Sequence, residues 1–184
     1  NDFGRDNLYR NDNGRFTDVA STAGLNAGEF GMSVSSADYD RDGHLDFYIG
    51  NMFSSAGSRI SRQPRFAKGL DPDLLEKFQH LARGNTLLRG NEDRGLQDST
   101  EMAGVALGRW SWSSLFADVN NDGWPDLYTT SDFADHDHLF INNQNGTFTD
   151  KIHDAMGHLS LNSMGSDIAD FDNDGLLDII TLDM

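Results

Sequence analysis

Short stretches of alternating apolar and polar residues recur along this 184-residue chain, separated by turns rich in Gly, Asn and Asp. Such alternation is typical of β-strands with one buried face. Two kinds of unit take turns along the chain. An inner unit, in which two strand-like segments flank an acidic loop, occupies 30–51, 110–131 and 162–184, and an outer hairpin occupies 7–25, 85–105 and 137–158. The pattern predicts an all-β protein.

The spacing of the acidic loops indicates a repeat. They begin at Asp38, Asp118 and Asp170, which are 80 and 52 residues apart, and segment 52–84 accounts for the excess in the first interval. Four short strands in a period of about 50 residues are typical of a β-propeller blade of four antiparallel strands. We therefore expect residues 1–184 to form about three blade equivalents of a partial propeller. A segment of a longer propeller is favoured over a ring completed by other chains.

The hairpins and the tryptophans allow finer predictions. Asn13-Gly14 and Asn145-Gly146 predict tight turns with positive φ at both residues. Trp110 and Trp112 alternate on a predicted inner strand, so both should face one side and pack between blades. A carbohydrate-stacking role is the alternative for this pair.

The sequence of segment 52–84 predicts a basic helical insertion within the first blade. Asp71 as N-cap, Pro72 at the first helical position and Gly84 as a stop predict one short amphipathic helix. The helix is preceded by four basic side chains. A solvated loop with a helix packed on the blade edge is the favoured reading, and the alternative is a partner-binding surface formed by Arg59, Arg62, Arg65 and Lys68.

Each acidic loop follows the pattern Asp-x-Asp/Asn-x-Asp-Gly-x-x-Asp, which brings alternate side chains toward one point. Positions 1, 3, 5 and 9 supply side-chain oxygens. Position 7 varies from loop to loop, as expected where the backbone carbonyl is the ligand. The predicted metal ligands are Asp38, Asp40, Asp42, His44 and Asp46 in the first loop; Asp118, Asn120, Asp122, Trp124 and Asp126 in the second; and Asp170, Asp172, Asp174, Leu176 and Asp178 in the third.

The charge of the chain supports bound cations. Asp and Glu number 30 against 14 Lys and Arg, a formal charge of −16, which argues against nucleic acid as a partner. Carboxylates about 4 Å apart repel by about 4 kcal/mol per pair at an effective dielectric constant of about 20. Oxygen ligands without Cys select a hard cation, so the loops predict three structural Ca²⁺ sites. A solvated acidic turn is the alternative, but it would be unlikely to recur three times in one register.

Two departures refine the metal prediction. Position 12 of the loops is Ile49, Thr129 or Thr181 rather than the Glu of an EF-hand, which excludes that fold. Asn120 removes one charge from the second loop, so we expect that loop to bind Ca²⁺ more weakly than the other two. The stretch 135–138, Asp-His-Asp-His, could bind a transition metal, but a polar surface turn is favoured there.

The repeats resemble a known family. Segments 37–48, 117–128 and 169–180 resemble FG-GAP (VCBS) repeats of the integrin α-subunit type. The hairpins, with Leu8-Tyr9-Arg10-Asn11 and Leu139-Phe140-Ile141-Asn142, and the stretch 162–165, Asn-Ser-Met-Gly, resemble the propeller of ASPIC/UnbV proteins, related to cartilage acidic protein. The resemblance implies an extracellular, surface-displayed or periplasmic propeller with structural Ca²⁺ and a role in adhesion or assembly. Segment 52–84 is not part of that pattern, and no C-terminal ASPIC/UnbV segment lies within these residues.

These observations favour a non-enzymatic interaction or scaffold module with a protein partner or complex. An enzyme on a propeller face, similar to a polysaccharide lyase or a phospholipase, is the first alternative. A subunit fixed in a larger complex through the basic insertion is the second. No stretch of transmembrane length and no nucleophile motif is present in the sequence.

Overall fold

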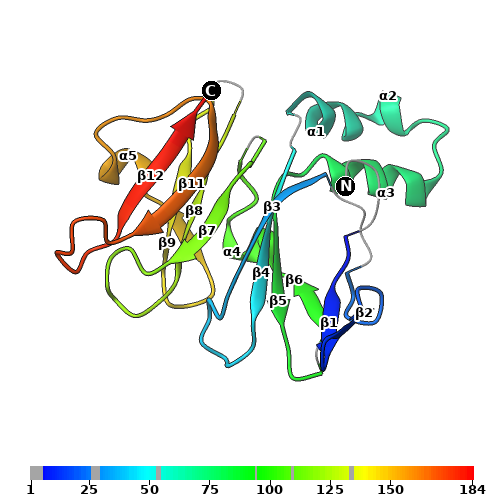
Figure 1. The fold of residues 1–184 in the computed structure, drawn as a ribbon. Helices are drawn as coiled ribbons and strands as arrows, with labels where there is room; N and C mark the ends of the chain where they lie inside the picture. Colours follow the sequence, from blue (N-terminus) through cyan, green and yellow to red (C-terminus); the bar gives the residue numbers. More distant parts are fainter. Residues whose placement is uncertain (1–5, 26–29, 53–54, 94, 109, 133–134) are drawn as a thin grey trace.

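Strands dominate the chain. The computed structural model describes residues 6–25, 30–52, 55–93, 95–108, 110–132 and 135–184, and within them twelve strands form four antiparallel sheets. The prediction of an all-β protein is therefore confirmed. Three of the sheets lie side by side in Figure 1, and in each of these an acidic loop joins the first two strands, 31–37 to 46–51, 114–117 to 126–129 and 163–169 to 178–183.

Two of the sheets have four strands and two are hairpins. The first four-stranded sheet runs in the order β3 (Gly31–Ala37), β4 (Asp46–Asn51), β5 (Thr86–Gly90) and β6 (Leu96–Asp98). The second runs in the order β7 (Ser114–Ala117), β8 (Asp126–Thr129), β9 (His138–Asn142) and β10 (Phe148–Asp150). The hairpins are β1 (Tyr9–Asp12) with β2 (Arg15–Asp18), and β11 (Ser163–Ala169) with β12 (Asp178–Asp183). Each strand falls inside an inner unit or outer hairpin that the sequence pattern predicts, and the pairs β4–β5 and β8–β9 join an inner unit to the outer hairpin that follows it.

Serine side chains join the first strands of neighbouring sheets. Ser33 Oγ on β3 lies 2.9 Å from Ser114 Oγ on β7, and Ser35 Oγ accepts a 3.1 Å hydrogen bond from Phe116 N. On the other side, Ser166 Oγ of β11 lies 2.8 Å from Ser113 Oγ. Small hydroxyl side chains allow the strands to approach closely, so β7 lies between β3 and β11.

The core lies between the sheets. One buried cluster fills the space between the two four-stranded sheets: Tyr39, Tyr48, Leu87, Ala103, Val105, Leu127, Phe140 and Phe148. A second cluster, centred on Tyr128, Leu139 and Ile152, packs the second sheet against Ile168 and Ile179 of the last hairpin. Strand β8 has all four residues buried, as expected for a strand with neighbours on both faces.

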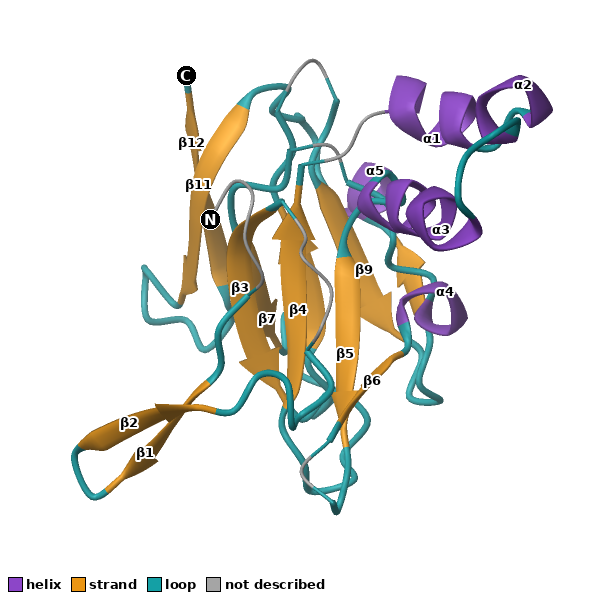
Figure 2. Cartoon of the chain, turned by 90° about the vertical axis from the view of Figure 1, so that its right-hand side faces the viewer, coloured by secondary structure: helices purple, strands orange, loops and turns teal. Residues whose placement is uncertain are grey.

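Three helices lie between β4 and β5, where the sequence predicted one: α1 (Ser55–Ser61), α2 (Pro64–Ala67) and α3 (Pro72–Leu81). The predicted helix is α3; the Asp71 carboxylate caps it by accepting from Asp73 N at 2.9 Å, and Gly84 follows with φ of 113°. Phe66 and Phe78 pack α2 on α3 with ring centroids 5.7 Å apart. Figure 2 shows these helices beyond one end of the strands. Residues 53–54 of the insertion lie outside the described residues.

Two further helices are single turns, α4 (Thr100–Ala103) and α5 (Ile152–Ala155), each directly after the last strand of a four-stranded sheet. Asp98 Oδ1 accepts from Thr100 N, and Asp150 Oδ1 accepts from Ile152 N, both at 3.0 Å. The same bond recurs after β2, from Ala20 N to Asp18 Oδ1 at 3.0 Å. An aspartate therefore ends each outer hairpin and begins a helical turn.

Two sequence predictions about local structure are wrong. The Asn-Gly turn is confirmed at Asn13-Gly14, with φ of 56° and 91°, but in the other hairpin the positive φ values fall on Gln144 and Gly146, so the turn there is longer. Trp110 and Trp112 precede β7 rather than forming part of it, because Trp110 has φ of 50°, which breaks an extended chain. Their ring centroids are nevertheless 6.5 Å apart.

Candidate metal-binding loops and a basic helical face

The three acidic loops have the same backbone shape. Position 4 lies in the left-handed region in each of them, with φ of 58° at Arg41, 57° at Asn121 and 63° at Asn173. The glycine at position 6 follows with φ of 90°, 87° and 89° in the same order. Only glycine adopts such values without strain, so the Gly of the motif is required by the turn.

Carboxylates hold this shape through backbone N–H groups. In the first loop, Asp38 accepts from Asp42 N and from Gly43 N, both at 3.0 Å, and Asp42 Oδ1 accepts from His44 N at 2.9 Å. The second and third loops repeat all three bonds to within 0.2 Å: 3.0, 2.8 and 2.9 Å, and 3.1, 3.0 and 2.8 Å. The residue at position 7, whose carbonyl oxygen is the predicted ligand, therefore donates its N–H to a carboxylate of the same loop.

The carboxylate at position 9 fastens the loop to the sheet. Asp46 is buried, and it accepts from Tyr39 N and from Gly90 N of β5, both at 2.9 Å. Burial raises the pKa of Asp46 to about 6, although the hydrogen bonds from the two N–H groups act to lower it. Asp126 makes the equivalent bonds to Val119 N and to Asn142 N of β9, at 3.1 and 2.8 Å, and burial raises its pKa as well.

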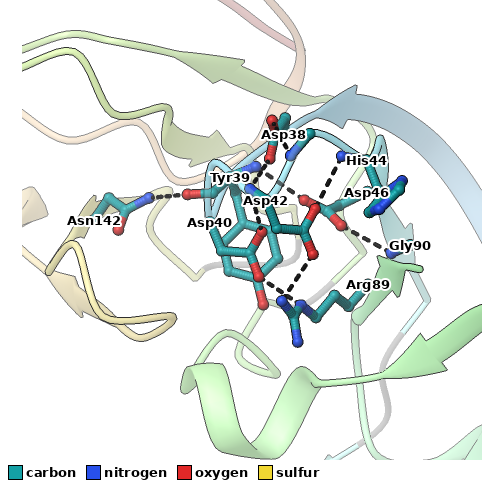
Figure 3. A network of polar contacts seen from close by, with 10 residues as sticks. Asp38, Tyr39, Asp40, Asp42, His44, Asp46, Arg89, Gly90 and Asn142 are labelled. Carbon is teal, nitrogen blue, oxygen red and sulfur yellow. Dashed lines mark hydrogen bonds and ion pairs between the residues drawn. The ribbon is translucent and has the colours of Figure 1, made fainter. Parts of the chain in front are cut away.

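A guanidinium lies against the first loop (Figure 3). Arg89 of β5 places Nε 2.5 Å from Asp40 Oδ2 and Nη2 2.8 Å from Asp42 Oδ2. Neither residue spacing nor the loop motif predicts this pair, because β5 follows the insertion. The one available signal is that Arg10 occupies the equivalent place in the first hairpin, where its guanidinium instead lies 2.9 Å from Asp12.

A neutral side chain, Gln144, contacts the second loop in the way that Arg89 contacts the first. Gln144 Nε2 donates to Asp122 Oδ2 at 3.1 Å, and so does Asn120 Nδ2 at 3.1 Å. Asn142 joins this loop to the first, since its Nδ2 donates to Tyr39 O at 2.8 Å and to Pro125 O at 3.0 Å.

Side chains at position 4 connect each loop to the next. The guanidinium of Arg41 stands 5.3 Å from the centre of the Trp124 ring, a cation–π contact between the first and second loops. Asn121 Nδ2 donates to Gly175 O of the third loop at 3.4 Å. The three loops are therefore one continuous rim rather than three separate turns.

The predicted ligands come together in part. The carboxylates of Asp38, Asp40 and Asp42 each offer an oxygen within 4.8 Å of the others, and so do those of Asp170, Asp172 and Asp178. Among the described residues, the aspartates of the second loop do not form such a group. The assignment of calcium to these loops therefore remains a prediction.

The stretch 135–138 is not the polar surface turn that we favoured. Asp137 and His138 are buried. Asp137 Oδ2 accepts from the Tyr128 hydroxyl at 2.5 Å and from Ser163 Oγ at 2.9 Å, and Oδ1 accepts from Ser131 N at 2.8 Å. The ring of His136 lies beside that of His153 of α5, a neighbour that the sequence did not indicate.

The basic side chains of the insertion face solvent. Arg59 lies on α1, Arg65 on α2, and Arg62 and Lys68 in the adjoining turns, and all four are exposed. Beneath them, a cavity of about 390 Å³ is lined by apolar side chains, among them Ile60, Phe66, Phe78 and Trp110. The helices that carry these residues, α1 to α3, lie at the opposite end of β4 from the first acidic loop (Figure 1).

Comparison with known proteins establishes the class of this protein. A family model of the FG-GAP-like repeat matches residues 1–49 and 118–181, more than half of the chain. The chain belongs to the FG-GAP-like repeat family. The matched ranges include all three acidic loops and omit the helical insertion. A search of curated proteins finds no match. Among the described residues, no helix is long and apolar enough to span a membrane.

Proposed function

We propose that this chain is part of a calcium-stabilised β-propeller of the ASPIC/UnbV type that serves outside the cytoplasm as an interaction or scaffold module. Membership of the FG-GAP-like repeat family supports an interaction role. The order of strands supports the propeller, because in both four-stranded sheets the inner unit precedes the outer hairpin. The seam formed by β3, β7 and β11 would be the innermost layer of the blades.

The calcium part of the proposal is supported by one loop geometry that occurs three times, together with carboxylates that converge in the first and third loops. In the first loop, Asp40 and Asp42 form ion pairs with a positively charged side chain, the guanidinium of Arg89. Hard oxygen donors in a compact loop fit Ca²⁺. The side chains at positions 1, 3, 5 and 9 and the carbonyl of His44, Trp124 or Leu176 would hold the ion, which would neutralise the loop and fix two strands.

The loops should differ in affinity. The second loop has Asn120 in place of a carboxylate, and the first has Arg89 beside it, which repels a second cation. The third loop carries four aspartates, and no ion pair is found there among the described residues. We therefore expect the third loop to bind Ca²⁺ most tightly. Calorimetry that found the second loop tightest would contradict this order.

Isothermal titration calorimetry tests calcium binding. The wild-type chain should bind three Ca²⁺ ions, and Mg²⁺ at the same concentration should bind more weakly. Asp170→Ala should reduce the stoichiometry to two by removing position 1 of the third loop. The matched control is Asp167→Ala, an exposed aspartate three residues earlier on β11, which should leave three sites. Absence of Ca²⁺ binding to the wild-type chain would refute the proposal.

The partner surface is proposed to be the exposed basic face of the insertion, formed by Arg59, Arg62, Arg65 and Lys68. These cations stand on a chain whose net charge is −16, so they mark a face of opposite sign. The partner chemistry that fits them is an acidic protein surface. Long-range attraction would steer such a partner to the helices and away from the acidic rim.

A further inference from the structure

Three imidazole rings gather at the end of β9 opposite the second acidic loop. His138 is the first residue of β9, His136 lies two residues before it, and His153 belongs to α5. The ring centroids of His136 and His138 are 5.0 Å apart, and those of His136 and His153 are 4.5 Å apart. Two of these residues come from the 135–138 stretch, and α5 brings the third beside them.

A carboxylate fixes the orientation of His138. Its Nδ1 lies 2.7 Å from Asp150 Oδ2, and Asp150 is itself held by the N–H of Ile152. A carboxylate only accepts hydrogen bonds, so Nδ1 of His138 carries the proton.

The opposite nitrogen of His138 has an unused lone pair. The side chain is only 7% exposed, and Nε2 finds no hydrogen-bond partner among the described residues. A buried polar atom without a hydrogen-bond partner destabilises the fold. The ring is also held in place by stacking on Phe140, with centroids 5.4 Å apart and planes at 12°. Because buried polar atoms nearly always have a hydrogen-bond partner, a rigid, buried nitrogen without one indicates a binding site.

His136 has the same arrangement. Its Nδ1 lies 2.8 Å from the carbonyl oxygen of Asp137, which can only accept, so Nε2 again bears the lone pair. Histidines that bind metals regularly donate their other ring N–H to a carboxylate or a backbone carbonyl, as both residues do here. His153 is exposed on α5 next to His136, so its ring is free to turn.

We propose that His136, His138 and His153 form a binding site for a divalent late transition metal, with Zn²⁺ as the expected ion. Three neutral imidazoles are typical ligands for Zn²⁺ and leave one position for water. This nitrogen set differs in kind from the oxygen-only loops. The rings of neighbouring histidines stand edge to face, so metal binding requires rotation of the exposed His153 ring and adjustment of His136.

Calorimetric titration with Zn²⁺, in a large excess of Ca²⁺ to occupy the acidic loops, tests the site. The full chain should bind one Zn²⁺. His153→Ala and His136→Ala should each weaken binding at least about tenfold, and His158→Ala, an exposed histidine outside the cluster, should not change it. Circular dichroism checks that each variant is folded. No Zn²⁺ binding under these conditions, or equal binding by the His153→Ala variant, would overturn the proposal.

Asp150→Asn separates metal binding from a purely structural role. The asparagine keeps Oδ1 for Ile152 N, but its amide would donate to Nδ1 of His138 and move the ring proton to Nε2, where it blocks the metal. We expect Zn²⁺ affinity to fall about tenfold to a hundredfold. Nitrogen chemical shifts of the His138 ring should show a protonated Nε2 in the variant. Unchanged affinity in a variant that shows this tautomer would contradict the assignment of Nε2 as a ligand.

Discussion

At the scale of single residues, one buried position of the repeat keeps the same contacts in two hairpins, although its side chain is an amide in one and a carboxyl group in the other. Asn85 and Asp137 occupy equivalent places, one at the start of each outer hairpin. Asn85 Nδ2 lies 2.7 Å from the Tyr48 hydroxyl and 3.0 Å from Ser111 Oγ, while its Oδ1 accepts from Asn51 N at 2.9 Å. Asp137 contacts a tyrosine, a serine and a backbone N–H in the same way, so the position needs a planar polar group rather than a charge.

This equivalence predicts the effect of substitution at Asp137. Asp137→Asn should change the free energy of unfolding by less than about 1 kcal/mol, because the amide can contact the same three groups with the donor direction reversed. Asp137→Leu should destabilise by about 3 kcal/mol or more, since it leaves Tyr128, Ser131 and Ser163 without their buried partner. Urea denaturation measures both. Equal losses in the two variants would contradict the equivalence with Asn85.

Arg89 gives the second prediction at this scale. If the first loop binds Ca²⁺, Arg89→Gln should raise its affinity by about fivefold, because a like charge is removed from Asp40 and Asp42. A doubly charged ion and a guanidinium about 6 Å apart would repel by about 6 kcal/mol at a dielectric constant of about 20, and solvent screening at this partly exposed side chain reduces the effect to about 1 kcal/mol.

The measurement is a calcium titration of a chain that carries Asp118→Ala and Asp170→Ala, so that only the first loop remains complete. Arg10→Gln is the matched control, because Arg10 occupies the equivalent strand position but pairs with Asp12. A fall in affinity on removing Arg89 would show that the guanidinium supports the loop rather than competing with the ion.

Individual residues also mark the limit of sequence-based prediction. The motif placed the acidic side chains in the loops, because turn geometry is local and the required glycines are part of the pattern. Arg89 and His153 could not be predicted, since their neighbours depend on which strands pair and on where α5 packs. Burial of Asp137 and His138 was missed because a short polar stretch is exposed in most proteins, and only the surrounding sheets reverse that.

At the scale of elements, strand pairs were predictable and the segments between them were not. The inner units and outer hairpins contain the observed strands because alternation and turn residues act over short distances. Asn145-Gly146 failed as a two-residue turn because Asn143 N bonds to Thr147 O at 2.9 Å, which closes a longer loop. In the insertion, α1 and α2 lack the capping pattern that revealed α3, and Phe66 holds α2 through its contact with Phe78.

The insertion also supports a prediction about binding. The wild-type chain should bind immobilised polyglutamate, a simple acidic probe, at low ionic strength, and added salt should weaken this binding. Simultaneous Arg59→Glu, Arg62→Glu and Arg65→Glu substitution should reduce it by tenfold or more, because three cations on neighbouring turns become anions. Surface plasmon resonance provides the readout.

A control of equal charge is available elsewhere on the surface. Arg10→Glu, Arg15→Glu and Lys151→Glu alter three exposed basic residues outside the insertion by the same total charge. If this control loses as much binding as the insertion variant, net charge rather than the helical face governs association. The proposed partner surface would then be wrong.

At the scale of the whole molecule, neighbouring sheets are joined at three levels. Serine hydroxyls connect the first strands, the two apolar clusters fill the space between sheets, and Arg41 and Asn121 connect the loops along the rim. The sequence predicted the repeat that makes these levels possible. It could not predict the contacts themselves, because the serine contacts and the loop contacts join residues more than 50 positions apart.

The hydrogen bonds inside the acidic loops also bear on how fast an ion could bind. The N–H groups at positions 5, 6 and 7 are bonded to the carboxylates of positions 1 and 5, so groups of the chain itself hold the loop backbone in shape. Capture of an ion would then await no slow rearrangement of the chain. Its rate would be set by diffusion and by the loss of water from the ion, so these loops would follow rapid changes in the ionic surroundings of the protein.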